Sequence, residues 1–186
     1  MRFVTNRRGR RRALPPFSGA GSAGTLAGME IEIRPVRPGD HDAVRRLAPR
    51  LLIGVDPSRP PELVRHAVDG WVRDSLAAAG ADDHASWVAM AGDTVVGFVS
   101  VTEDEHWCGQ TDAWVGELVV DERQERQGVA RSLVARAEDW ARERGLTRVR
   151  LSTGAANHGA LAFYERIGYE PTDVTLTREL GAAPGG

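Results

Sequence analysis

The strongest constraint on this chain is a change of hydrophobic periodicity at Gly128. The preceding residues 118–120 are apolar and typical of a buried strand, whereas Val129, Leu133 and Ala137 recur at the spacing of one helix face. Such a junction leaves the first backbone N–H groups of the helix without helical partners and concentrates partial positive charge there. Gly128 lets the backbone approach a ligand closely. The junction predicts a phosphate cradle, although alone it is a weak signal that any strand-to-helix turn can give.

Composition limits the class of protein. The chain has 186 residues, of which 41% are hydrophobic, and this suits one compact soluble domain. No apolar run approaches the roughly 20 residues that a membrane-spanning helix requires. The single cysteine, Cys108, excludes an internal disulfide framework and a multi-cysteine zinc site, and no metal is expected. A cytoplasmic protein without a membrane partner is the default expectation.

Residues 1–28 differ in charge from the rest of the chain. They hold six arginines and no acidic residue, while the complete chain has a net charge of −2 and no lysine. The remainder is therefore acidic, which disfavours nucleic acid as a partner of the folded part. Three interpretations stay open: an unstructured extension or misplaced start, an arm for nucleic acid or a membrane surface, and a transit peptide. We favour the first, because Met29 leads directly into a strand-like segment.

The periodicities predict one mixed α/β domain over residues 29–180, preceded by a disordered Arg-rich extension at 1–28 and followed by a flexible tail at 181–186. The predicted strands are 30–36, 86–91, 94–101, 112–120, 146–153 and short closing strands near Tyr169 and at 174–177. The predicted helices are about 40–51, 61–79, 129–144 and 156–167, and a polar connection is expected over 103–110. A right-handed crossover makes the strands at 112–120 and 146–153 parallel.

Two motifs point to a known family. The residues Gly128-Val129-Ala130 match the second half of a glycine-containing signature, and residues 157–169 read Asn-x-x-Ala…Phe-Tyr-x-x-x-Gly-Tyr. With them, residues 119–171 resemble the GNAT superfamily of acyl-coenzyme A dependent N-acetyltransferases, and the order of elements extends the resemblance over 30–180. It implies a mostly antiparallel central sheet that splays at one parallel strand pair, with helices on both faces.

The resemblance implies that acetyl-coenzyme A (acetyl-CoA) is the co-substrate. Its pyrophosphate would be wrapped by residues of the cradle, namely Arg126, Gln127, Gly128, Val129, Ala130 and Arg131, with Ser132 assisting. The backbone of Leu118, Val119 and Val120 would pair with the pantetheine arm, and an N–H of Leu118 or Val119 would stabilise the oxyanion. Asn157 would contact the pantetheine or diphosphate. Glu125 departs from the family pattern, which has Arg or Gln there, so backbone N–H groups must hold the phosphates.

Tyr164 is the candidate catalytic acid. A phenol has an unperturbed pKa of about 10, slightly above that of a thiol, so its hydroxyl can protonate the departing thiolate. Without the surrounding motif, Tyr164 would be assigned to core packing. The candidate general base is Glu117, which interrupts an apolar strand. Alternation places it on one face with Ala113, Val115 and Val119, in an apolar cleft that would raise its pKa. A solvent-facing strand residue is an equal alternative.

Several other residues are weaker candidates for a role in the site. Asp112 and Glu105 are alternative bases, and the acidic run 103–106 could attract a cationic acceptor but is more often solvated loop. Trp107 and Trp114 could line the acceptor side, although packing is the more common role of tryptophan in strands. His106 and Cys108 have no partners at metal-ligand or nucleophile spacing, and both are assigned to structure.

The predicted function is transfer of an acetyl group from acetyl-CoA to a primary amine by direct attack in a ternary complex. The acceptor pocket is expected from residues 53–59, the strand start at Asp112 and the closing strands. Small-molecule amine, aminoglycoside-like antibiotic, peptide N-terminus and protein lysine all stay open as acceptors. The alternative is a non-catalytic acyl-CoA sensor, and nucleic-acid binding through the Arg-rich extension comes third. Family members commonly dimerise, so a homodimer is one expected state.

Overall fold

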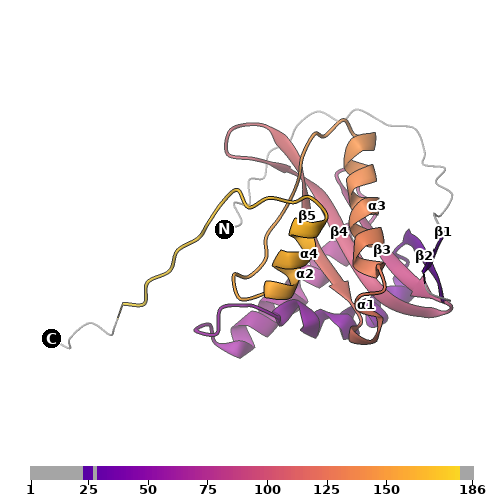
Figure 1. Ribbon diagram of the computed structural model, residues 1–186, viewed down its shortest axis with the longest axis horizontal. Helices are drawn as coiled ribbons and strands as arrows, with labels where there is room; N and C mark the ends of the chain where they lie inside the picture. The colour runs from indigo at the N-terminus through magenta and orange to yellow at the C-terminus, as the bar shows by residue number, and fades with distance from the viewer. Residues whose placement is uncertain (1–22, 27–28, 181–186) are drawn as a thin grey trace.

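The sheet is the organising element of the fold. A computed structural model describes residues 23–26 and 29–180 (Figure 1). Six strands lie in the order in which they follow each other along the chain, and every neighbouring pair is antiparallel except the last. They are β1 Ala23–Leu26, β2 Met29–Pro35, β3 His84–Ala91, β4 Thr94–Glu105, β5 Thr111–Val120 and β6 Val149–Leu151. The predicted mixed α/β fold, with one parallel strand pair, is confirmed.

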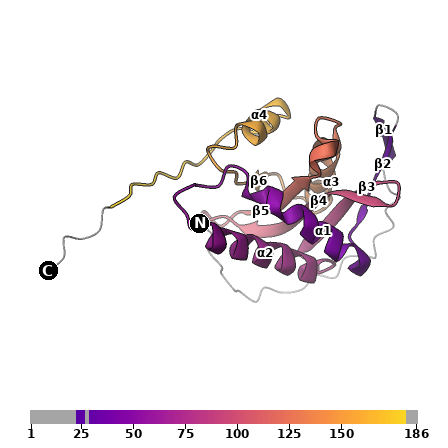
Figure 2. The same ribbon diagram turned by 90° about the horizontal axis from the view of Figure 1, so that it is seen from below.

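Helices cover both faces of this sheet. The α-helices are α1 His41–Leu47, α2 Pro61–Ala78, α3 Val129–Glu143 and α4 His158–Arg166, and the 3-10 turns are η1 Pro38–Asp40, η2 Ala48–Leu52 and η3 Glu122–Gln124. Figure 2 shows α1 and α2 on one side and α3 and α4 on the other. Pro61 begins α2, where a missing N–H is harmless, and Gly145 follows α3 with a positive φ of 72°.

The two helical layers enclose two cores. On one face α3 buries Val129, Leu133 and Ala137 against Val99 and Val101. Gly97 allows this close approach, because a Cβ there would lie 2.9 Å from the Leu133 Cδ1. On the other face a second set of apolar side chains is buried, comprising Val44, Leu47, Val68, Val72, Leu76, Phe98 and Val119. Strand β5 contributes to both cores, with Val115 in the first and Val119 in the second.

Helix α2 buries a narrow apolar stripe. Val68, Val72 and Leu76 are buried, whereas Leu63 and Trp71 on the same helix are exposed. Ser75 takes a buried position three residues after Val72. A serine at that spacing in an apolar stripe indicates a specific partner inside the protein, since a buried hydroxyl is costly without a hydrogen bond.

Four predicted segments differ in the structure. Strand β4 continues through Glu105, so residues 103–105 are paired strand and not polar connection. Strand β6 is only three residues long. The closing strands are wrong for the described residues: the chain after α4 runs away from the sheet as an extended segment (Figure 1), in which Leu176 is 90% exposed. Finally, β1 lies inside the predicted extension, whose residues 1–22 and 27–28 fall outside the described ranges, as does the tail 181–186.

Candidate active site

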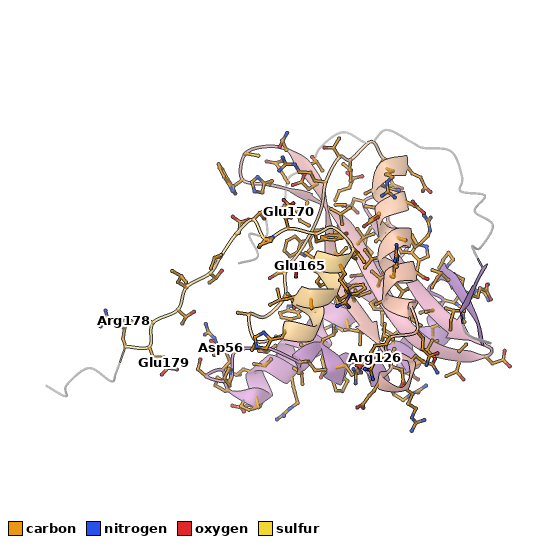
Figure 3. All side chains as sticks on the ribbon, in the orientation of Figure 1. Asp56, Arg126, Glu165, Glu170, Arg178 and Glu179 are labelled. Carbon is orange, nitrogen blue, oxygen red and sulfur yellow. The ribbon has the colours of Figure 1, made fainter. Side chains whose placement is uncertain are left out.

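The cradle between β5 and α3 contains two residues whose backbone is in the left-handed conformation. Arg126 has a φ of 60°, and Gly128, the residue preceding the first turn of α3, has a φ of 81°. Helical hydrogen bonding begins with the Ser132 N–H, which donates to the Gly128 carbonyl at 3.0 Å. The amides of Val129, Ala130 and Arg131 therefore precede the first bonded turn and point out of its end, as in an anion site. Figure 3 shows Arg126 at this end of α3.

Glu125, the departure from the family pattern, is neutralised within the protein. Its carboxylate pairs with the Arg50 guanidinium, which also lies 3.6 Å from the Glu122 carboxylate. The Gln127 side chain donates to the Arg123 carbonyl at 3.0 Å and so braces the loop. Arg50 belongs to η2, on the other layer of the fold. The acidic residue thus ties the cradle to the opposite layer.

Beyond its first half, β5 has a side that β6 does not cover. The parallel pairing joins Ala113–Val115 to Val149–Leu151 and goes no further. Residues 118–120 pair with β4 on their other side, Leu118 opposite Val99 and Val120 opposite Gly97. The strands thus separate after Val115, where the resemblance places the pantetheine arm, and the gap between them extends along Leu118–Val120 to the cradle. These residues fit an anionic ligand that carries an extended arm.

Asn157 closes the turn after β6. Its Oδ1 accepts from the Ala160 N–H at 3.2 Å and caps α4, while its Nδ2 donates to the Ile53 carbonyl at 3.2 Å. The turn and the loop after η2 are in close contact, since a Cβ on Gly54 would lie 2.7 Å from the Asn157 backbone nitrogen. The structure therefore gives Asn157 a structural role at the far side of the gap. The predicted contact of this residue with coenzyme A stays a prediction.

A β-bulge in β5 orients Glu117. The register with β4 shifts between Val99 and Val101, so that Gly116 and Glu117 both stand opposite Ser100. As a result, Ala113 and Val115 face the α3 core, whereas Glu117 faces α2. The prediction that these side chains share one face is wrong, because simple alternation contains no inserted residue. The solvent-facing alternative for Glu117 is also wrong, since it is only 3% exposed.

Two serine hydroxyls bind the Glu117 carboxylate. The Ser75 Oγ donates to Oε2 at 2.7 Å, and the Ser100 Oγ donates to the same oxygen. The Glu117 backbone N–H in turn donates to the Ser100 Oγ at 3.1 Å. Ser75 and Ser100 were not predicted as site residues. Their only sequence signal is a hydroxyl placed within an apolar helix stripe and within an apolar strand.

Tyr164 lies in an aromatic cluster on α4. Its ring centroid is 5.1 Å from that of Phe163 and 5.6 Å from that of Tyr169. Burial raises the pKa of Tyr164 to about 12, so the hydroxyl keeps its proton at physiological pH. Tyr169 donates to the Glu138 Oε1 at 3.2 Å, and burial together with this carboxylate raises its pKa as well. Helix α4, which carries Tyr164, lies on the same side of the sheet as α3 (Figure 2), whereas the Glu117 carboxylate bonds Ser75 of α2 on the other side.

The remaining candidates have structural partners. Asp112 is buried and bonds the Arg150 Nε at 2.7 Å, while Asp104 bonds the Nη2 of the same guanidinium at 2.8 Å. His106 Nδ1 lies 2.9 Å from the Cys108 Sγ in the turn between β4 and β5, so these two residues are partners after all. The exposed Trp107 lies in the same turn, remote from Glu117 in the sheet register.

The residues of the predicted acceptor region make contacts in separate parts of the fold. The loop residues Ile53 and Gly54 contact the turn before α4, Asp112 is held by Arg150, and the described chain forms no closing strands.

Comparison with known proteins places this chain. Residues 46–169 match the model of the Acetyltransferase (GNAT) family, and the chain belongs to this family. It is 33% identical over 87 residues to N-acetyltransferase 8 of Homo sapiens, a match covering 46% of the chain and 38% of the relative. It is 30% identical over 84 residues to N-alpha-acetyltransferase 30 of Schizosaccharomyces pombe, covering 45% of the chain and 56% of that relative. The matches thus span about two fifths to just over half of these relatives.

Solved structures share the fold. The aminoglycoside N-acetyltransferase AAC(6')-Iy in complex with CoA superposes with a TM-score of 0.63 at 18% identity, covering 90% of this chain and all of that one. A GCN5-related N-acetyltransferase from Ralstonia eutropha gives a TM-score of 0.63 at 19% identity, covering 82% and 99%. Among the helices of the residues described, none is long and apolar enough to cross a membrane.

Proposed function

We propose that the protein transfers the acetyl group of acetyl-CoA to a primary amine by direct attack in a ternary complex. The observation that carries this proposal is the gap that opens along Leu118–Val120 beside a helix start with Gly128 in the left-handed conformation. The cradle amides would bind the pyrophosphate, and the uncovered side of residues 118–120 would bind the pantetheine as an added strand. Membership of the GNAT family supports this ligand.

The reaction needs a base on one side of the thioester and an acid on the other. The ammonium of the acceptor gives one proton to Glu117, directly or through water, and the amine nitrogen then attacks the thioester carbonyl carbon. A backbone N–H of Leu118 or Val119 stabilises the resulting oxyanion. The C–S bond breaks as the amide forms, and the departing thiolate takes a proton from Tyr164. The amide nitrogen gives its second proton to the Tyr164 phenolate, which restores the phenol. Glu117 then releases to solvent the proton that it accepted from the ammonium.

The position of the two catalytic candidates agrees with these roles. Glu117 faces the α2 layer and Tyr164 belongs to the layer of α3 and α4, so base and acid approach the sheet from opposite sides. The raised pKa of Tyr164 keeps the phenol protonated, which an acid requires. The serine hydroxyls fix the orientation of the Glu117 carboxylate before the acceptor binds.

An acceptor screen that follows free thiol tests the proposal. The panel contains an aliphatic diamine, an aminoglycoside, a peptide with a free N-terminus, and a lysine peptide with a blocked N-terminus. We expect thiol release that depends on at least one amine, with a matching gain of one acetyl group in that amine by mass spectrometry. Calorimetric binding of acetyl-CoA without any such release would favour a sensor, and absence of binding would contradict the cofactor assignment.

The same screen addresses the Arg-rich extension. The full chain and a chain that starts at Ala23, which keeps β1 and removes the six arginines, should give equal thiol release if the Arg-rich segment takes no part in the reaction. DNA affinity that falls with salt and disappears in the shorter chain would support the nucleic-acid arm instead.

A further inference from the structure

A cavity lies on the α2 side of the sheet, next to the buried Glu117. It has a volume of about 210 Å³, and residues of α2, β3, β4 and β5 line it: Asp74, Ser75, Ala78, His84, Ser100, Thr102, Trp114 and Gly116. We call it the α2-face pocket. Ser75 and Ser100, whose hydroxyls bind the Glu117 carboxylate, form part of its wall. The bulge in β5 is what directs both Gly116 and Glu117 toward this pocket.

We propose that the α2-face pocket binds the acceptor and selects an aliphatic primary amine without a nearby anionic group. This inference rests on the proposed function. The pocket adjoins the candidate base from the layer opposite α3, so an amine in it and a thioester in the gap would approach the same stretch of β5 from two sides. No residue of the predicted acceptor loop 53–59 lines it.

The charges around the pocket favour a cation. Its lining contains the Asp74 carboxylate, hydroxyl groups and an imidazole, but no arginine among the described residues, and the Glu117 carboxylate lies behind two of the hydroxyls. Burial lowers the pKa of His84, so its imidazole adds no positive charge at neutral pH. Two arginines lie nearby, and both are already paired: Arg73 with Asp74 at 3.3 Å, and Arg150 with Asp104 and Asp112. An anionic acceptor would therefore meet the Glu117 carboxylate without an unpaired arginine to compensate for it.

The size and shape of the pocket limit what can enter. A volume of about 210 Å³ is below the roughly 300–1,000 Å³ of pockets that enclose a drug-sized ligand. Only the amine-bearing end of a larger acceptor can enter, with the remainder outside. The Trp114 indole offers an apolar wall for methylene groups, and Arg150 lies 5.4 Å from the ring centroid. An aminoalkyl arm fits these requirements.

Three amines of equal chain length test the charge preference without any variant. We expect kcat/KM to be at least about tenfold higher for n-butylamine and 1,4-diaminobutane than for 4-aminobutanoate, because the carboxylate is repelled. A higher value for 4-aminobutanoate, or equal values for all three, would overturn the assigned substrate class. Thiol release with none of the panel amines would instead contradict the proposed function.

A matched pair of variants tests the location. Ala78→Trp fills the pocket. Ala77→Trp places the same indole one position earlier in α2, where the side chain is exposed. We expect Ala78→Trp to raise the KM of the preferred amine at least about tenfold while the acetyl-CoA dissociation constant and the melting temperature match those of Ala77→Trp. If the two variants acetylate equally well, the acceptor binds elsewhere and the proposed function survives. Should Ala78→Trp fail to fold, Thr102→Leu gives the same comparison against Thr94→Leu.

Discussion

The two ends of β5 recognise ligands by different means. At Val120 the strand enters a cradle made of backbone amides and one glycine, all within residues 121–131. Near Trp114 the same strand faces a pocket made of side chains from four elements, brought together by a bulge. A backbone site can be read from a short stretch of sequence, whereas a side-chain site depends on the tertiary structure. Variants at the first end should change cofactor affinity, and variants at the second should change amine kinetics.

The largest expected effect is at Glu117, on the pocket side. Glu117→Gln keeps the shape of the side chain and removes the base, so kcat should fall by about 10³, within the range for general acid–base catalysis. Steady-state thiol release at saturating acetyl-CoA measures it. The exposed Glu165→Gln on α4 is the matched control and should retain wild-type activity. Unchanged kcat in Glu117→Gln, with an intact fold, would remove Glu117 from the mechanism.

Tyr164→Phe tests the acid on the cofactor side and should lower kcat by about 10². Tyr169→Phe, which changes the only other tyrosine, should leave kcat near the wild-type value. Equal losses in the two variants would indicate that both rings act through packing.

Tyr164→Phe should also change how the stability of the protein depends on pH. Because the folded-state pKa of Tyr164 is about 12 and the unfolded value about 10, the unfolded chain loses this proton first, and stability falls as pH rises from 10 toward 12. Thermal melts over this range should show a smaller decline in Tyr164→Phe than in the wild type. Part of the decline should persist, since the pKa of Tyr169 is raised too.

Gly128→Ala should weaken acetyl-CoA binding about tenfold, because a Cβ and a strained φ disturb the cradle. Gly145→Ala, at the other end of α3, carries a similar strain with a φ of 72°. Both variants should lose about 1–2 kcal/mol of stability, and only Gly128→Ala should lose affinity by calorimetry. If affinity falls equally in both, the effect comes from α3 as a whole and not from the cradle.

The smallest effect is expected from Arg50→Ala, which leaves Glu125 unpaired beside the cradle. The KM for acetyl-CoA should rise about two- to fivefold at low ionic strength, and the difference should fade with added salt. Arg45→Ala, which breaks an exposed pair with Asp42, should leave this KM unchanged. A salt-independent change would mean that Arg50 acts by packing.

The two ends also differ in how well the sequence predicted them. The helix start at Gly128, the amphipathic α3 and the strands predicted at 86–91 and 94–101 follow from local rules of periodicity, and the structure agrees with them. The orientation of Glu117 could not be predicted, because a bulge adds one residue that alternation does not reveal. Ser75 and Ser100 acquire meaning only when α2 and β4 meet. The strand character of 103–105 was hidden by acidic side chains that pair with Arg144 and Arg150.

The bulge also makes the burial pattern of β5 tolerant of a change in strand length. Gly116 and Glu117 both face α2, so deleting Gly116 would restore strict alternation and leave Glu117 on the α2 side, with Leu118 and Val119 in the cores that they occupy now. A one-residue slip of residues 117–120 against β4 would instead turn the Glu117 carboxylate toward the apolar side chains of α3. The strand can therefore lose a residue at Gly116 far more easily than it can shift its pairing with β4.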